Sequence, residues 1–224
     1  MVTIHTNVSD FRYLDNIPHF NANNEQPRIF VACVDSYHNR KVYGVWLNAM
    51  QEIEAIKQQI SIMLSGSHYL EPDVYRAPRM YAIHAQEGFY DLQLNVHADI
   101  EYIRAQALFI AKHGELGAKL INHYEGTLEA AEEVINQRYQ GEYKSQLEYA
   151  TQLFDKLYLN TIPEHIQFCI NYESFKKTIF NHYFFSIGLE GKTHVFFEYL
   201  GDWDCRQGLD DFLKPYRCTL PIND

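Results

Sequence analysis

Apolar and polar residues give the first part of the chain a clear strand–turn–strand pattern. Apolar, β-branched and aromatic residues fill 29–34 and 42–47, and turn-forming residues separate the two runs. This arrangement is typical of a β-hairpin. Isoleucine and leucine then recur at helical spacing over 53–64, with Gly66 as the expected stop of the helix, and residues 80–84 can return as a third strand. The pattern therefore predicts a small ββαβ unit over about residues 28–90.

The pattern changes to a helical one after residue 98. Asp99 can cap a helix that ends at Gly114, and a short helix follows over 116–121. Thr127 can cap the next helix, which we expect to run to about Tyr139.

The last third of the chain combines helix caps with a final pair of strands. Ser145, with a glutamate three residues later, forms a capping box that begins a helix. Pro163 suits the first turn of another helix, and Asn171 can cap the helix after it. Residues 183–199 predict a closing β-hairpin around two glycines.

These elements predict an α+β protein made of three small modules in series. The expected division is an N-terminal extension at 1–26, a ββαβ-like N-terminal module at 27–98, a helical module at 99–144, a C-terminal α+β module at 145–200 and a C-terminal extension at 201–224.

Composition indicates a soluble protein with reduced thiols. No stretch approaches the roughly 20 consecutive apolar residues that a membrane-spanning helix needs. Residues 1–24 lack the apolar segment of a signal peptide, and the four cysteines are widely spaced. We therefore expect a cytoplasmic protein.

Acidic residues outnumber basic residues, 29 to 19, and the excess lies in the middle of the chain. Residues 86–164 hold 13 acidic and 6 basic residues, whereas residues 1–85 hold 8 and 7. A protein that binds nucleic acid directly normally presents a basic face. The charge distribution therefore argues against direct DNA binding, although it names no function.

Familiar catalytic motifs are missing from the chain. It contains no GxGxxG, GxxxxGK[ST], GxSxG or HExxH sequence, and its 11 histidines lack the close spacing of zinc ligands. We expect no metal and no cofactor. One enzyme hypothesis remains, a hydrolase that uses His113 with Glu115, and it requires a cleft that holds both groups.

Four glutamates near the centre form the most informative charged group. They fall at positions i, i+4, i+7 and i+8, and they are Glu125, Glu129, Glu132 and Glu133. They would share one flank if the helices there run on almost continuously. The simpler interpretation is a solvated helix face. The functional one is a negative surface that replaces the phosphates of DNA, for which one helix alone carries too little charge.

Several segments follow one another in an order that a known family shares. They are RIFVACVDSYHN at 28–39, GVWL at 44–47, YAIH at 81–84, the stretch from GEL to YQGEYKS at 114–145, IP at 162–163 and INYESF at 170–175. The individual motifs are loose, but their order and spacing are specific. On these segments the chain resembles the ArdA-type antirestriction proteins of plasmids and conjugative transposons, from about Pro27 to Tyr199.

The resemblance implies a non-enzymatic inhibitor of type I restriction–modification enzymes in the cytoplasm of a bacterial host. Proteins of this family are elongated, acidic homodimers of three small domains. Their carboxylates imitate the phosphates of bent DNA in the groove of the methyltransferase core. The carboxylates expected to do so here are Glu87, Asp91, Asp99, Glu101, Glu115, Glu125, Glu129, Glu132, Glu133, Glu142, Glu148 and Asp155. Structural roles within the motif are expected for Gly126, Leu128, Ala131, Tyr139 and Gly141.

The chain also departs from the family pattern. Ala85 stands where the family has aspartate after the AIH sequence, and Asn171 replaces another aspartate. An alternative function is therefore an acidic module of the same fold that binds another DNA-binding host protein, such as a transcription regulator. The histidines suggest in addition that acidification could cancel much of the negative charge and weaken binding between pH 7.5 and 6.

Overall fold

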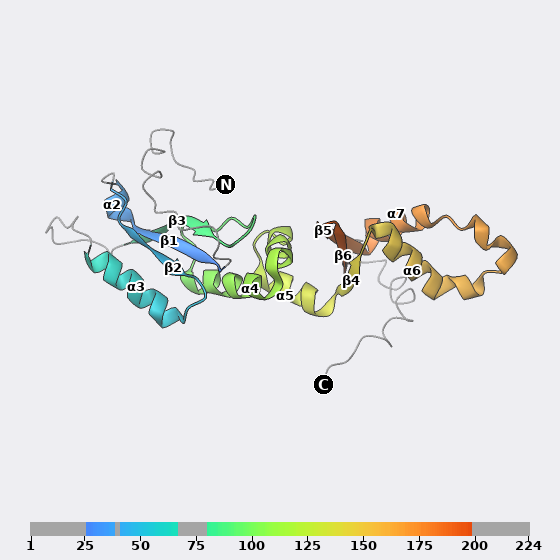
Figure 1. Cartoon of the computed structure of the whole chain (residues 1–224), viewed down its shortest axis with the longest axis horizontal. Coiled ribbons are helices and arrows are strands. Elements are labelled where there is room, and N and C mark those ends of the chain that lie inside the picture. The colour runs from blue at the N-terminus through green and yellow to red at the C-terminus, as the bar shows by residue number, and fades with distance from the viewer. Residues whose placement is uncertain (1–25, 39–40, 67–79, 199–224) are drawn as a thin grey trace. The chain divides into compact units, whose positions relative to one another are not determined.

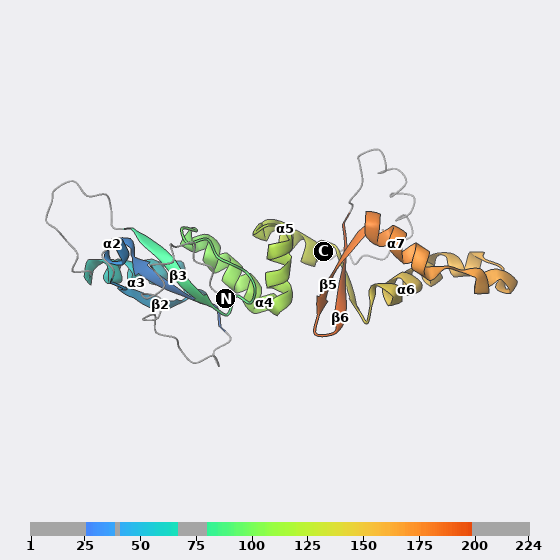
Figure 2. The same ribbon diagram turned by 90° about the horizontal axis from the view of Figure 1, so that it is seen from above.

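The computed structural model describes residues 26–38, 41–66 and 80–198, which form helices and two small antiparallel sheets (Figures 1 and 2). The α+β class expected from the sequence is therefore confirmed. The chain divides into two compact units, Met1–Ala131 and Glu132–Asp224. The C-terminal extension, and the N-terminal one apart from Gln26, lie outside the described residues. The division into three modules stays a prediction.

The first unit contains a three-stranded sheet of β1 (Arg28–Cys33), β2 (Gly44–Asn48) and β3 (Tyr81–Glu87), in the order β2-β1-β3. Both pairings are antiparallel, so the predicted hairpin is confirmed. A short helix, α2 (Val34–His38), stands in the connection where only a turn was expected. All of β1 except Arg28 is buried, as the central strand of a covered sheet requires.

Helix α3 (Ile53–Gly66) has the predicted limits and buries Ile56, Ile60 and Met63. It lies along the sheet beside β1 and β2 (Figure 1). Apolar residues one helical turn apart therefore face the sheet, as an amphipathic helix requires.

Helix α4 (Ile100–His123) contains both helices that the sequence predicted in this region. Asp99 caps it by accepting a hydrogen bond from the Glu101 N–H at 2.7 Å. At Gly114 the backbone leaves the helical region, with φ 62° and ψ −147°, and the helix is kinked there. The expected cap and the expected break are both confirmed.

The next helix ends earlier than predicted. Helix α5 (Leu128–Gln137) stops two residues before Tyr139, and β4 (Tyr139–Tyr143) follows where the helix was expected to end. The prediction was wrong because β4 pairs with a strand more than 50 residues later, which local spacing does not reveal. Gly141 has φ 117° and lies at the irregularity in this pairing.

The second unit packs helices against a sheet in the order β4-β6-β5. Its elements are α6 (Gln146–Tyr158), η2 (Leu159–Thr161), η3 (Glu164–Cys169), α7 (Tyr172–His182), β5 (Phe184–Leu189) and β6 (Lys192–Phe197). The core of this unit joins side chains from α6, α7 and the sheet, among them Tyr149, Leu153, Ile179, Phe184 and Val195.

The sequence placed most of these boundaries correctly. Ser145 accepts a hydrogen bond from the Glu148 N–H at 3.1 Å, and Asn171 accepts one from the Ser174 N–H at 2.9 Å. Both predicted caps are confirmed. Pro163 precedes a 3-10 helix instead of an α-helix.

The two departures from the family pattern have local structural consequences. Ala85 is 9% exposed and packs with Phe30 and Ala32, so a carboxylate at this position would be largely buried. Asn171 keeps the capping role, because asparagine and aspartate cap helices about equally well.

Candidate partner-binding surface

Helix α5 is strongly divided between an apolar side and an acidic side. Leu128, Ala131 and Val134 are buried, whereas the glutamates at 129, 132 and 133 are exposed. Residues three and four apart on a helix have neighbouring side chains, with Cβ atoms about 5–6 Å apart. The three carboxylates therefore form one acidic flank, and Leu128 and Ala131 lie on the apolar side of the helix.

Glu125 does not lie on this helix. The four glutamates were expected to share one flank only if the two helices ran on almost continuously, and they do not. Helix α4 ends at His123, and a turn separates it from α5. In the turn Glu125 has φ 53° and Gly126 has φ 91°. The Gly126 N–H bonds to the Ile121 carbonyl at 2.8 Å, as in helix ends that have a glycine in the left-handed region. Gly126 therefore belongs to the turn that ends α4.

No lysine, arginine or histidine occurs from 125 to 137. The carboxylates of Glu125, Glu129 and Glu132 make no ion pair or hydrogen bond with any residue that the structure describes. We call these three residues the open carboxylates. Glu133 differs from them, because it pairs with Arg138 just after the helix.

Six of the twelve predicted carboxylates are paired with a cation of the same chain. The pairs are Glu87 with Arg28, Asp91 and Glu115 with Lys119, Glu101 with Lys57, Glu133 with Arg138, and Glu142 with Lys192. Their negative charge is locally offset, so they are less available to an outside cation than the open carboxylates.

Three further carboxylates have neutral hydrogen-bonding partners. Asp99 caps α4, and the Glu148 carboxylate accepts a hydrogen bond from the Lys144 N–H at 2.6 Å. Asp155 accepts one from the Tyr172 hydroxyl at 2.6 Å. These contacts give the three residues structural roles that the sequence showed for Asp99 and Glu148 but not for Asp155.

A polar network links β4 with β6 inside the second unit. The Tyr139 hydroxyl lies 2.8 Å from His194 Nδ1, and His194 Nε2 lies 4.0 Å from a Glu142 oxygen. Lys192 lowers the pKa of Glu142 through a hydrogen bond of 2.6 Å. Burial lowers the pKa of His194 although Glu142 acts in the opposite direction. Tyr139 therefore anchors the two strands to each other.

Lys119, the cation shared by two predicted carboxylates, was not predicted from the sequence. Its ammonium lies 3.3 Å from Glu115 and 3.7 Å from Asp91. The pair with Glu115 has the i,i+4 spacing that favours helix ion pairs, and this signal was visible in the sequence. The contact with Asp91 comes from a segment outside the helix and has no local signal.

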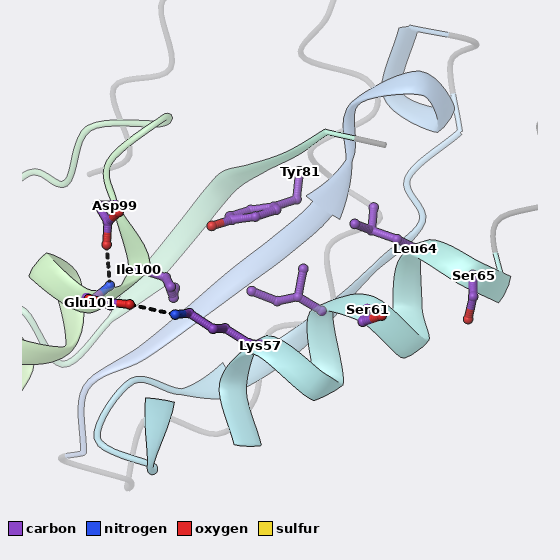
Figure 3. Close-up of a pocket in the computed structure, with 9 residues that line it drawn as sticks. Lys57, Ser61, Leu64, Ser65, Tyr81, Asp99, Ile100 and Glu101 are labelled. Atoms are coloured by element: carbon purple, nitrogen blue, oxygen red, sulfur yellow. Dashed lines mark hydrogen bonds and ion pairs between the residues drawn. The ribbon is translucent and has the colours of Figure 1, made fainter. Parts of the chain in front are cut away.

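The first unit contains a hollow of about 650 Å³, which is a candidate for an enzymatic cleft (Figure 3). Figure 3 shows Lys57 reaching from α3 to Glu101 at the start of α4. The Lys57 ammonium donates a hydrogen bond of 2.5 Å to the Glu101 carboxylate. Ser61 and Tyr81 also line the hollow, and burial raises the pKa of Tyr81. The described residues that line it include no histidine and no cysteine.

The hydrolase hypothesis gains no support from His113 and Glu115. Neither residue lines this hollow. The His113 ring packs on Phe109, with 4.6 Å between centroids, and burial lowers its pKa. Glu115 is bound to Lys119 instead of to the imidazole. The described residues therefore do not join the two groups into a catalytic pair.

Within residues 26–38, 41–66 and 80–198, no group of three or more histidine, cysteine, aspartate or glutamate residues is placed to hold a metal ion. Among the described helices, none is both long enough and apolar enough to cross a membrane.

Comparison with protein families gave a match over most of the chain. A family model described as "Antirestriction protein (ArdA)" matches residues 29–188. The matched range includes both sheets in part and the whole of α4 and α5. A comparison with curated proteins found no match.

Proposed function

Because the chain belongs to the ArdA family of antirestriction proteins, we propose that it inhibits type I restriction–modification enzymes by occupying the DNA-binding groove of their methyltransferase core. In this mechanism carboxylates of the protein meet the lysines and arginines that otherwise hold DNA phosphates. The inhibitor forms no covalent bond and needs no cofactor.

The observation that carries this proposal is the set of open carboxylates, one in the turn before α5 and two on that helix. They are exposed, and no basic residue lies between 125 and 137 to offset them. Glutamates four residues apart on a helix are separated by about 6 Å along its axis. One strand of DNA carries a charge about every 3.4 Å of axis. The flank therefore has a lower charge density than DNA, so we propose that several acidic segments contribute together.

Binding by such a surface is a sum of weak terms. An exposed ion pair contributes about 0–1 kcal/mol, and salt screens it. Single substitutions should therefore matter little, and groups of them should matter much. The complex should also weaken as the salt concentration rises, as protein–DNA complexes do.

The family resemblance further supports a homodimer that acts in the cytoplasm of a bacterial host. A dimer would double the number of carboxylates that a single target can meet. Sedimentation equilibrium at micromolar concentration tests this part of the proposal, and a monomer there would contradict it.

Competition with DNA tests the main proposal. The purified full-length protein is titrated into a type I methyltransferase core bound to fluorescent duplex DNA, at two salt concentrations. We expect displacement at near-stoichiometric protein and weaker displacement at the higher salt. An unrelated DNA-binding protein, assayed in parallel, reports whether displacement is selective. Absence of displacement at both salt concentrations would contradict the proposal and direct the search to other DNA-binding host proteins.

A further inference from the structure

A tyrosine of α4, Tyr102, forms hydrogen bonds with the turn that contains Glu125 and with the start of α5. The Tyr102 hydroxyl donates a hydrogen bond to the Gly126 carbonyl at 2.5 Å and accepts one from the Leu128 N–H at 2.9 Å. The two bonds bridge the junction at which the chain leaves α4 and enters α5. A single side chain thereby fixes both the end of the turn and the first residue of the next helix.

A second polar side chain of α4 reaches the same carbonyl. Gln106 is only 5% exposed, and its Nε2 lies 3.4 Å from the Gly126 oxygen. Buried side-chain amides are almost always hydrogen-bonded, because leaving them unpaired is unfavourable. The Gly126 carbonyl is therefore held by two donors from successive turns of α4.

The turn needs this support because its backbone is unusual. Glu125 has φ 53°, and the left-handed region is unfavourable for a non-glycine residue by about 1–2 kcal/mol. The Leu128 N–H belongs to the first turn of α5 and so has no partner within that helix. Contacts from α4 compensate for both features.

We infer that Tyr102 and Gln106 are positioning residues for the carboxylates of Glu125 and Glu129. By fixing the turn and the start of α5, they hold the two carboxylates in place before the partner arrives. A partner that meets fixed groups loses less conformational entropy on binding than one that must order them. This inference rests on the proposed function, in which these carboxylates meet cations of the restriction enzyme.

Tyr102→Phe tests the inference in the DNA competition assay. The substitution keeps the ring and removes only the hydroxyl. We expect roughly five- to twentyfold weaker displacement, because two hydrogen bonds at the junction are lost. Tyr90→Phe is the matched control, since it removes an exposed hydroxyl of the same unit, and it should displace DNA as the wild type does.

A double-mutant cycle separates positioning from general stability. Tyr102→Phe is repeated in a chain that already carries Glu125→Gln and Glu129→Gln. A positioning residue has little further effect there, because the carboxylates it positions are gone. A residue that acts only through overall stability weakens both chains by the same factor, and that result would overturn the inference.

If Tyr102→Phe lowers the melting temperature below the assay temperature, Gly126→Ala tests the same inference. An added Cβ at Gly126 meets no atom within 4 Å, so the substitution disturbs only the left-handed turn. We again expect weaker displacement. If the wild type displaces DNA and both folded variants match it, the inference is wrong and the proposed function stands. If the wild type itself displaces no DNA, the proposed function fails first.

Discussion

Two acidic regions of this protein look alike in the sequence and differ in the structure. The open carboxylates, Glu125, Glu129 and Glu132, have no cation beside them among the described residues. Asp91 and Glu115 are also surface carboxylates, but both lie within 4 Å of the Lys119 ammonium. The first region carries three negative charges, whereas Asp91, Glu115 and Lys119 together carry a net charge of −1.

The difference shows that a count of carboxylates does not measure how much negative surface a partner meets. A lysine or arginine of the proposed target could approach the open carboxylates directly. At the Lys119 cluster it must compete with an internal ammonium. Because exposed ion pairs are weak, this competition reduces the contribution of the cluster without abolishing it.

Charge reversal at the open carboxylates should have the largest effect on inhibition. We expect the triple variant Glu125→Lys, Glu129→Lys and Glu132→Lys to lose about 2–4 kcal/mol of binding, or 30- to 1,000-fold, because three attractions become repulsions. The DNA competition assay measures this loss.

The matched control reverses three other exposed glutamates, Glu54, Glu164 and Glu190. It changes the net charge equally and also includes one residue with positive φ, Glu190 at 50°, as the first triple includes Glu125. Equal losses in the two triples would show that only net charge matters, and the comparison between regions would then have no basis.

A buried histidine, His84, should make the folded protein less stable at acidic pH, which restricts the pH range in which binding by the two acidic regions can be compared. His84 is 8% exposed, and burial, with a smaller effect of His97, lowers its pKa to about 4. Above about pH 6.5 the imidazole is neutral in both the folded and the unfolded chain. Between pH 6.5 and 4 only the unfolded chain takes up the proton, so the free energy of unfolding should fall by about 3 kcal/mol at most.

Urea unfolding of the wild type and of His84→Phe at pH 7 and pH 5 checks this expectation. The variant should lose less stability than the wild type on acidification. A difference between the two proteins that is the same at both pH values would show that His84 does not titrate as described. Binding is best compared above pH 6.5, where this effect is absent.

Matched neutralisations should give a smaller but more direct comparison. Glu129→Gln with Glu132→Gln removes two open carboxylates, and Asp91→Asn with Glu115→Gln removes the two partners of Lys119. Both double variants change the net charge by the same amount. We expect about tenfold weaker displacement for the first and about two- to threefold for the second. The reverse order would mean that the target contacts the Lys119 cluster first.

The sequence predicted most of the fold because most of its signals are local. The caps at Asp99, Ser145 and Asn171 and the break at Gly114 depend on residues within one turn of each other. Strand β4 was missed because it is fixed by pairing with β6, far along the chain. Local spacing favours a helix up to Tyr139, and the long-range pairing overrides it.

The candidate surface was predicted only in part, for a related reason. Sequence identified the acidic residues, since charge is a property of each residue alone. It did not identify which of them are paired, because the Asp91–Lys119 and Glu101–Lys57 contacts join segments brought together by folding. The left-handed turn at Glu125 also had no signal beyond the glycine that follows it.

Removing the internal cation should produce the smallest effect, and in the opposite direction. Lys119→Gln releases both Asp91 and Glu115, which raises the negative charge of the cluster from one to two. We expect roughly two- to fourfold tighter displacement of DNA and a steeper dependence on salt. Lys177→Gln, an exposed lysine of α7, is the control with the same change in net charge. Equal gains in both variants would show that the effect comes from the net charge of the protein and not from the Lys119 cluster. A gain confined to Lys119→Gln would show that the pairing of carboxylates inside the protein limits how strongly its surface can replace DNA.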